Sequence, residues 1–263
     1  MSVGLPTTAL PRNAKSLALQ CGTVHLRSAF AALLVLPFLA GCLNFGGPTP
    51  QDYLTSAYSK WVVEVDYAQG HQPSQSVLDF VKSRLSAVVN KPGGIQFLYD
   101  ESLTDADKTW GDDALTYANA HQNQHTGGDT VVTHLLFVAG SNREDNGDSK
   151  VLGETWGRGP IVIFSDSVNG ACTTGGIIPT VGCDATTVME AVVTHEFGHA
   201  LGLVNNGVSM VKDHEDGSHP RHSSNRNSVM YYATETSAIV QLNGIPTDYD
   251  ADDKADLHAA GGK

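Results

Sequence analysis

The spacing of apolar residues changes several times along this chain, and each spacing predicts a different element. Short runs of apolar, β-branched and aromatic residues predict strands at 61–67, 95–99, 130–139, 151–156 and 161–164. Apolar residues at helical spacing predict helices at 75–89 and 186–204, and we expect a shorter helix at 112–121. Strands that alternate with helices in this way are typical of an α/β protein, in which a sheet packs on helices.

The first forty residues have the pattern of an export signal. An apolar run covers 29–41 after the basic residue Arg27, and it is shorter than the roughly 20 residues that a membrane-spanning helix needs. The end of this run, Leu39-Ala40-Gly41-Cys42, resembles the bacterial lipobox, in which a peptidase cuts before the cysteine and the cysteine is then acylated. An ordinary signal peptide with an incidental cysteine is the alternative. Residues 1–23 are long for the start of such a signal, so a translation start near Val24 stays open.

We therefore expect three parts in the chain. Residues 1–41 are the lipoprotein signal peptide, 42–51 are the lipidated Cys42 with a Gly/Pro-rich tether, and 52–263 have the size of one folded domain. Two or more acyl chains give stable anchoring where a single chain is marginal. The domain is thus expected to be a monomer on a lipid anchor, at the outer membrane or cell surface, facing the periplasm or the exterior.

The cysteines agree with export. Cys21 lies in the discarded segment and Cys42 is the expected lipid site, which leaves Cys172 and Cys183 as an even pair. We expect a disulfide between them, because disulfides persist outside the cytosol. Two free thiols are the alternative.

The predicted helix at 186–204 carries the chemistry. Its His195-Glu196-x-x-His199 sequence places two imidazoles one turn apart, about 5–6 Å from each other at Cβ. With about 100° per residue, His199 falls about 40° and Glu196 about 100° from His195, so one arc holds two ligands and a carboxylate. Two histidines at this spacing by chance are the alternative, which the intervening glutamate argues against. The spacing predicts a zinc site.

A catalytic zinc needs a third protein ligand and a water. The helix resembles that of the metzincin metallopeptidases, whose pattern continues His-Glu-x-x-His-x-x-Gly-x-x-His. Here Gly202 is in place, but Asn205 stands where the family has its third histidine. In matrixins and archaemetzincins the third histidine lies eight residues before the methionine of the Met-turn, and His222 and Met230 have this separation. The resemblance therefore implies His222 as the third ligand and 205–221 as an insertion.

Other ligands stay open. His219 and His214 lie in the same polar loop, and Asn205 or a carboxylate such as Glu215 is a weaker candidate. The archaemetzincin pattern also has two cysteines after the third histidine, and this chain has Ser223 and Ser228 in their places. The loop histidines could belong to a solvated loop, to a lid, or to a second metal.

The Met-turn resemblance extends to a tyrosine. In the astacin and serralysin branches, a tyrosine two residues after the methionine reaches the metal or the developing oxyanion, which makes Tyr232 a candidate catalytic residue. In matrixins the corresponding Met-Tyr sequence has no such role, so Tyr232 could simply pack. Met230 on its own could be an ordinary core residue.

The resemblance implies a zincin/metzincin-like fold. This is a twisted, mostly parallel sheet packed on the zinc-binding active-site helix, followed by the Met-turn and a C-terminal helix. In that family the edge strand binds substrate in extended form, and 151–156 occupies the corresponding place in chain order. The acidic tail at 248–257 lacks the glycine and spacing of an EF-hand, so we expect an acid-capped helix there.

Composition narrows the classes of function. The 263 residues are 41% hydrophobic and 17% charged, which argues against a fibrous, disordered or polytopic membrane protein. Asp and Glu outnumber Lys and Arg by 28 to 16, giving a net charge of −12, the wrong sign for a nucleic-acid partner.

The sequence thus predicts a zinc-dependent endopeptidase, held at the membrane as a lipoprotein. A zinc-activated water would attack the peptide bond, with Glu196 as general base and one catalytic Zn²⁺. The substrate is expected to be a peptide or protein bound as an extended strand. A non-catalytic zinc-binding or scavenging lipoprotein that uses the His-rich loop is the alternative, and a peptidase of cell-wall peptides is a third possibility.

Overall fold

The structure is a computed structural model that describes residues 47–123, 127–146, 149–174, 178–179 and 183–263. The expected signal peptide and Cys42 lie outside these residues. In chain order the elements are α1 (Pro50–Leu54), β1 (Lys60–Ala68), α2 (Gln75–Val88), β2 (Gly94–Leu103), β3 (Asp107–Trp110), α3 (Asp113–Ala120), β4 (Thr130–Asn142), β5 (Gly153–Thr155), β6 (Ile161–Phe164), α4 (Ser165–Ala171), β7 (Thr173–Thr174), β8 (Ile178–Pro179), α5 (Ala185–Leu201), β9 (Glu215–Asp216), β10 (His219–Ser223), η1 (Tyr232–Glu235), η2 (Ser237–Gln241) and α6 (Ala251–Ala259).

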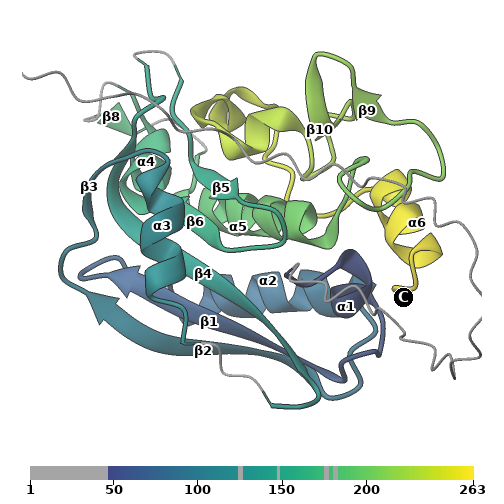
Figure 1. The fold of residues 1–263 in the computed structure, drawn as a ribbon. Coiled ribbons are helices and arrows are strands. Elements are labelled where there is room, and N and C mark those ends of the chain that lie inside the picture. The colour runs from purple at the N-terminus through teal and green to yellow at the C-terminus, as the bar shows by residue number, and fades with distance from the viewer. Residues whose placement is uncertain (1–46, 124–126, 147–148, 175–177, 180–182) are drawn as a thin grey trace, which may run out of the picture. The chain divides into compact units, whose positions relative to one another are not determined.

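The main sheet is six-stranded and mostly parallel. Its strand order is β2-β1-β4-β6-β5, and β3 pairs with the last residues of β4. The strands β2, β1, β4 and β6 run parallel, while β5 is antiparallel to β6 at the edge. The expected α/β architecture, a mainly parallel sheet packed on helices, is confirmed (Figure 1).

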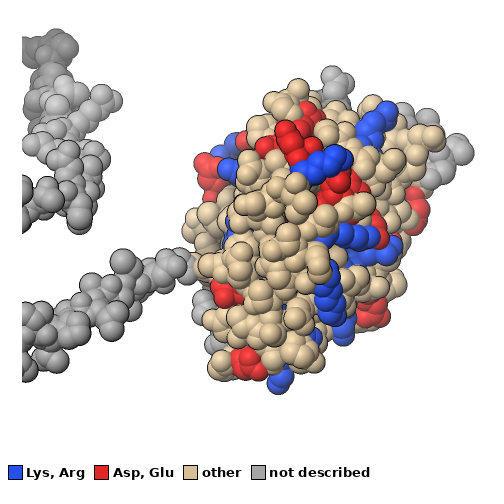
Figure 2. Space-filling view, turned by 90° about the vertical axis from the view of Figure 1, so that its right-hand side faces the viewer, with Lys and Arg blue, Asp and Glu red and all other residues tan. Residues whose placement is uncertain are grey.

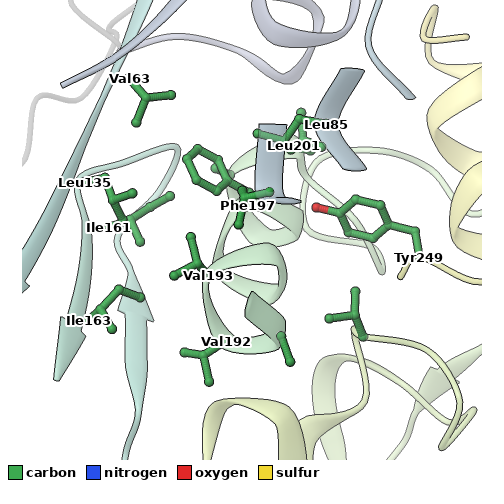
Figure 3. Close-up of a cluster of buried hydrophobic side chains, with 14 of the residues drawn as sticks. Val63, Leu85, Leu135, Ile161, Ile163, Val192, Val193, Phe197, Leu201 and Tyr249 are labelled. Atoms are coloured by element: carbon green, nitrogen blue, oxygen red, sulfur yellow. The ribbon is translucent and has the colours of Figure 1, made fainter. Parts of the chain in front are cut away.

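The larger core lies between the sheet and the helices α2 and α5. Along β1 the residues Trp61, Val63 and Val65 alternate with side chains of the opposite face, as a strand requires. Phe197 of α5 points from the helix toward the sheet residues Val63, Leu135 and Ile161 (Figure 3), and its ring centroid is 5.6 Å from that of Trp61. This packing holds α5 against the sheet.

The opposite face of the sheet is covered by α3. Ala114 and Ala118 of this helix pack with Trp110, Leu136 and Phe164 in a second apolar cluster. The small alanines let the helix approach the sheet closely, and Figure 1 shows α3 across the strands on that side. Strands β1, β4 and β6 are therefore largely buried on both faces, as is usual for parallel strands, while most of β2 is not buried.

Helix α5 begins and ends at recognisable caps. The Asp184 side chain accepts hydrogen bonds from the backbone N–H groups of Thr186 and Thr187 at the N-terminus. At the other end Gly202 has φ 89°, in the left-handed region that favours glycine, so the helix stops at Leu201. The helix expected to reach residue 204 is thus shorter than predicted. Val204 is still buried, but it follows the glycine turn.

The folded region begins inside the segment expected to be a tether. Pro50 stands in the first turn of α1, and Thr49 and Asp52 form a capping box, so this Pro-rich sequence is helical. Tyr53 and Leu54 are buried in the larger core. The Tyr53 hydroxyl donates a hydrogen bond to the backbone carbonyl of Arg158 at 3.1 Å, which ties α1 to the rest of the fold.

Several other boundaries differ from expectation. The strand expected at 151–156 is limited to β5, 153–155, and β3 and α4 were not anticipated. The acidic tail forms α6, whose N-cap Asp250 accepts hydrogen bonds from the N–H groups of Asp252 and Asp253. This helix is the acid-capped C-terminal helix that the sequence predicts.

A disulfide joins Cys172 to Cys183, as expected, and links the end of α4 to the residues before α5. A bond that closes a loop with a sequence separation of 11 stabilises the fold by about 2–3 kcal/mol in the chain-entropy model.

We therefore expect reduction of the Cys172–Cys183 disulfide to lower the free energy of unfolding by this amount, measured by urea titration with and without reductant. The Cys172→Ser/Cys183→Ser variant serves as control. Its free energy of unfolding should be the same with and without reductant. If the reductant lowers the free energy of unfolding of this variant as much as that of the wild type, the effect does not come from the Cys172–Cys183 disulfide.

Two properties of the surface complete the description. Among the described residues, no helix has the length and apolar character needed to cross a membrane. On the face shown in Figure 2, acidic and basic side chains lie interspersed among uncharged ones, so the charge there is mixed in sign.

Candidate metal centre

Four side chains from three parts of the chain converge at one point. His195 and His199 come from α5, His222 from β10 and Glu235 from the end of η1. Each offers a ligand atom, and these four atoms lie within 4.8 Å of one another. His195 and His199 are buried, and their Nε2 atoms are 3.0 Å apart. The cluster could hold a metal ion.

Hydrogen bonds to backbone carbonyls orient two of the imidazoles. His195 Nδ1 lies 2.7 Å from the carbonyl oxygen of Val229, and His222 Nδ1 lies 3.1 Å from that of Pro220. A carbonyl can only accept, so in both rings Nδ1 carries a proton, which in the neutral imidazole leaves the lone pair on Nε2. Both Nε2 atoms belong to the cluster. Such outer partners are the usual device that fixes the tautomer of a metal-binding histidine.

The structure brings His222, and neither His219 nor His214, to the two helix histidines. The ring centroid of His222 is 5.3 Å from that of His195 and 5.0 Å from that of His199. His219 instead pairs with Asp216 at 2.8 Å between Nδ1 and Oδ2.

The remaining alternatives are also engaged elsewhere. His214 is buried with its Nε2 2.9 Å from Oδ2 of Asp256 in α6. The side-chain amide of Asn205 lies 3.3 Å from the carboxylate of Glu215, outside the cluster. A second metal in this loop stays a prediction.

A turn between β10 and the following residues positions His222. The strands β9 and β10 pair antiparallel, and Arg221 has φ 69° just before the histidine. The next residue, Ser223, donates its N–H to the carbonyl oxygen of Met230 at 2.8 Å. His222 and the Met-turn residue are thereby held in one local unit, which is why their spacing along the chain is informative.

Met230 lies directly against α5. It is fully buried, and a Cβ atom at Gly198 would overlap its Sδ atom. The glycine between the two helix histidines therefore leaves room for the methionine. The N–H of Met230 donates to the hydroxyl of Ser228 at 2.9 Å, which closes the turn.

Glu196 lies beside the cluster and faces the edge strand β5. Its Oε2 accepts a hydrogen bond of 2.7 Å from the Thr155 hydroxyl, while its Oε1 is buried without a hydrogen-bond partner among the described residues. A Cβ at Gly153 would lie 2.8 Å from Oε1, so this glycine lets the carboxylate sit against the strand. Burial, together with the nearby Glu235 carboxylate, raises the pKa of Glu196 well above its usual value.

Tyr232 points elsewhere. Its ring stacks on that of His219 with 3.6 Å between the centroids, and it is not one of the four residues of the metal cluster. The catalytic role considered for Tyr232 stays a prediction, which would need this stacked pair to separate.

Glu235 was not anticipated from the sequence. Its Oε2 lies 3.5 Å from His195 Nε2 and 3.8 Å from His199 Nε2, and its Oε1 lies 3.2 Å from His222 Nε2. Burial alone would raise the pKa of this carboxyl, but the three imidazoles hold it below its usual value. Glu235 is not related to the three histidines by the periodicity of a helix or a strand, so the residue pattern of the sequence does not indicate it.

A cavity of about 700 Å³ opens at the cluster. Its wall includes Glu154, Thr155 and Trp156 from β5 and the residue after it, with His199, His222 and Glu235 at the metal end. Burial and the nearby carboxylates of Glu144 and Glu235 raise the pKa of Glu154 to about 6. The cavity thus connects the cluster with the edge strand.

The donor set fits zinc. Imidazole nitrogens and a carboxylate are ligands that Zn²⁺ takes in proteins. In the described part of the chain, the buried Nε2 of His222 makes no hydrogen bond of acceptable geometry, although Glu235 lies 3.2 Å away. A buried polar atom costs free energy when it has no partner, and a metal ion at the cluster would supply one.

Comparison with known proteins adds two solved structures. Neither a protein-family model nor a curated protein sequence matches this chain. Archaemetzincin from Methanopyrus kandleri superposes with a TM-score of 0.48 at 15% identity, covering 77% of this chain and 96% of that one. Metalloproteinase-II from Bacteroides fragilis superposes with a TM-score of 0.41 at 13% identity, covering 80% of this chain and 55% of that one.

Proposed function

We propose that this protein is a zinc-dependent endopeptidase. The observation that carries the proposal is the placement of Glu196, a buried carboxylate beside the converging imidazoles that is hydrogen-bonded to Thr155 in the cavity wall. A bound zinc would polarise a peptide carbonyl and lower the pKa of a water toward about 7. His195, His199 and His222 would hold it.

The protein's own groups suit the proton transfers of peptide hydrolysis. Thr155 donates a hydrogen bond to Oε2 of Glu196, while the buried Oε1 accepts none from the described residues, so Oε1 keeps an unused acceptor position for the proton of the attacking water. The same carboxyl then passes the proton to the leaving amine nitrogen. Because Glu196 is buried next to the imidazoles, its carboxylate needs little rearrangement for this role.

The edge strand supports an extended peptide as substrate. β5 is the last strand of the sheet, and it pairs with β6 on one side. A peptide can add to such an edge through backbone hydrogen bonds. Proteins and cell-wall peptides are both candidate substrates.

Two substrate classes test the proposal together. The protein loaded with zinc would be incubated with casein and with peptidoglycan, and products would be identified by mass spectrometry. We expect cleavage of one class, loss of cleavage after zinc removal by a chelator, and recovery when zinc is returned. Absence of cleavage in both substrates with zinc bound would favour the second candidate.

That second candidate is zinc binding without catalysis. Glu235 favours it, because four protein ligands are typical of a structural zinc site, whereas a catalytic site has three and a water. Metal stoichiometry separates a scavenger, which would bind two or more exchangeable ions, from the peptidase, which would bind one zinc tightly. A closed site with one tight zinc is instead distinguished from the peptidase by the absence of cleavage.

The proposal includes the lipid anchor at Cys42, which rests on the sequence of residues 39–42. We expect the full chain, expressed in a bacterium, to incorporate labelled palmitate and to fractionate with membranes. Cys42→Ser should lose both the label and the membrane association, and Cys21→Ser should keep both as the matched control. Labelling that survives Cys42→Ser would refute the anchor.

A further inference from the structure

The position of Glu235 matches that of a fourth metal ligand. In a tetrahedral zinc site with bonds of about 2.0–2.1 Å, the ligand atoms lie roughly 3.3 Å from each other. Oε2 of Glu235 lies 3.5 and 3.8 Å from Nε2 of His195 and His199, and its Oε1 lies 3.2 Å from Nε2 of His222. The two helix nitrogens are 3.0 Å apart, and the four ligand atoms all lie within 4.8 Å of one another. Building on the proposed zinc site, we propose that Glu235 is an internal fourth ligand that closes the site and keeps water and substrate from the metal.

The backbone around Glu235 supports this closed arrangement. The carbonyl oxygen of Glu235 accepts a hydrogen bond of 2.8 Å from the N–H of Leu152, and Thr236 forms an antiparallel bridge with Val151. The N–H of Ser237 donates to the carbonyl oxygen of Lys150 at 2.9 Å. Residues 235–237 therefore pair with 150–152, the segment that leads directly into β5. Residues 235–237 thus pair next to the edge strand β5, and this pairing places the Glu235 carboxylate at the metal cluster.

Opening the site requires the Glu235 side chain to move, while its backbone can stay. The neighbouring residues Ala233 and Thr234 are buried, which anchors the short helix η1. The Glu235 side chain is 30% exposed and lines the cavity of about 700 Å³, so it has space to rotate away. An incoming peptide carbonyl or water would then take the position that the carboxylate leaves. The arrangement would keep the metal inaccessible until the Glu235 side chain moves.

Metal binding tests the proposal independently of peptidase activity. Glu235→Ala and Glu235→Gln would be compared with the wild type by zinc competition against a chromophoric chelator and by the visible absorption of Co²⁺-loaded protein. Glu144→Gln is the matched control, because Glu144 also lines the cavity but lies outside the metal cluster. We expect a loss of at least about tenfold in zinc affinity and a changed Co²⁺ spectrum in both Glu235 variants, with neither change in the control.

Access to the metal gives a second readout. Acetohydroxamate, a small chelating probe, should bind the Co²⁺-loaded Glu235→Ala protein at least about tenfold more tightly than the wild type, because the fourth position is then open. Unchanged zinc affinity, Co²⁺ spectrum and acetohydroxamate affinity would overturn the proposal. If Glu235→Ala does not fold, as judged by circular dichroism, the isosteric Glu235→Gln variant decides. If the protein cleaves no substrate but the Glu235 variants show these changes, the fourth-ligand proposal is supported and only the proposed peptidase function is contradicted.

Discussion

Replacing Glu196 with glutamine is expected to abolish peptide hydrolysis while the metal stays bound. The amide keeps the shape of the side chain and can still pair with Thr155, but it cannot accept the proton of the attacking water. General-base catalysis contributes roughly 10²–10⁴ in rate, so kcat/KM should fall by at least that factor. Zinc content of the purified variant, measured by atomic emission, should equal that of the wild type.

A second glutamate on the same helix provides the control. Glu190 lies in α5 six residues earlier and is outside the metal cluster, so Glu190→Gln should keep both zinc and activity. Two outcomes would contradict the assignment of Glu196. One is full activity in Glu196→Gln, and the other is loss of zinc from that variant, which would make Glu196 a ligand.

Replacing His222 with alanine is expected to empty the metal site. The side chain supplies one of three imidazole nitrogens, and His195 and His199 on α5 would be left with Glu235. Loss of an outer hydrogen-bond partner already costs about 10–100-fold in metal affinity, so loss of a ligand should cost more. Zinc affinity by competition titration should fall by more than a hundredfold, and hydrolysis should disappear with it.

His219→Ala is the matched control for this prediction, since His219 lies in the same strand three residues away. Its imidazole pairs with Asp216 and stacks on Tyr232, so its removal should leave zinc affinity within about twofold. If His219→Ala loses zinc and His222→Ala keeps it, residues 205–221 do not form the insertion that the Met-turn spacing implies.

Part of the site follows from local geometry alone. His195 and His199 share a helix face because residues four apart do so in any α-helix, and Glu196 follows from the same periodicity. His222 was implied by the resemblance of its separation from Met230 to that in metzincins, and the structure shows a local reason for this separation, because Ser223 pairs with Met230. The mainly parallel sheet is readable for a similar reason, because apolar strands that alternate with helices can bury their faces in few other ways.

Other features depend on contacts between residues that are distant in the chain. Glu235 enters the cluster because residues 235–237 pair with 150–152, a contact that no local spacing encodes. Tyr232 faces His219 for the same kind of reason. Residue type and periodicity were therefore enough for the zinc helix and the class of fold. The fourth ligand, and with it whether the site is open or closed, is decided by tertiary packing, because side chains from separate segments acquire their distances only when the whole chain is folded.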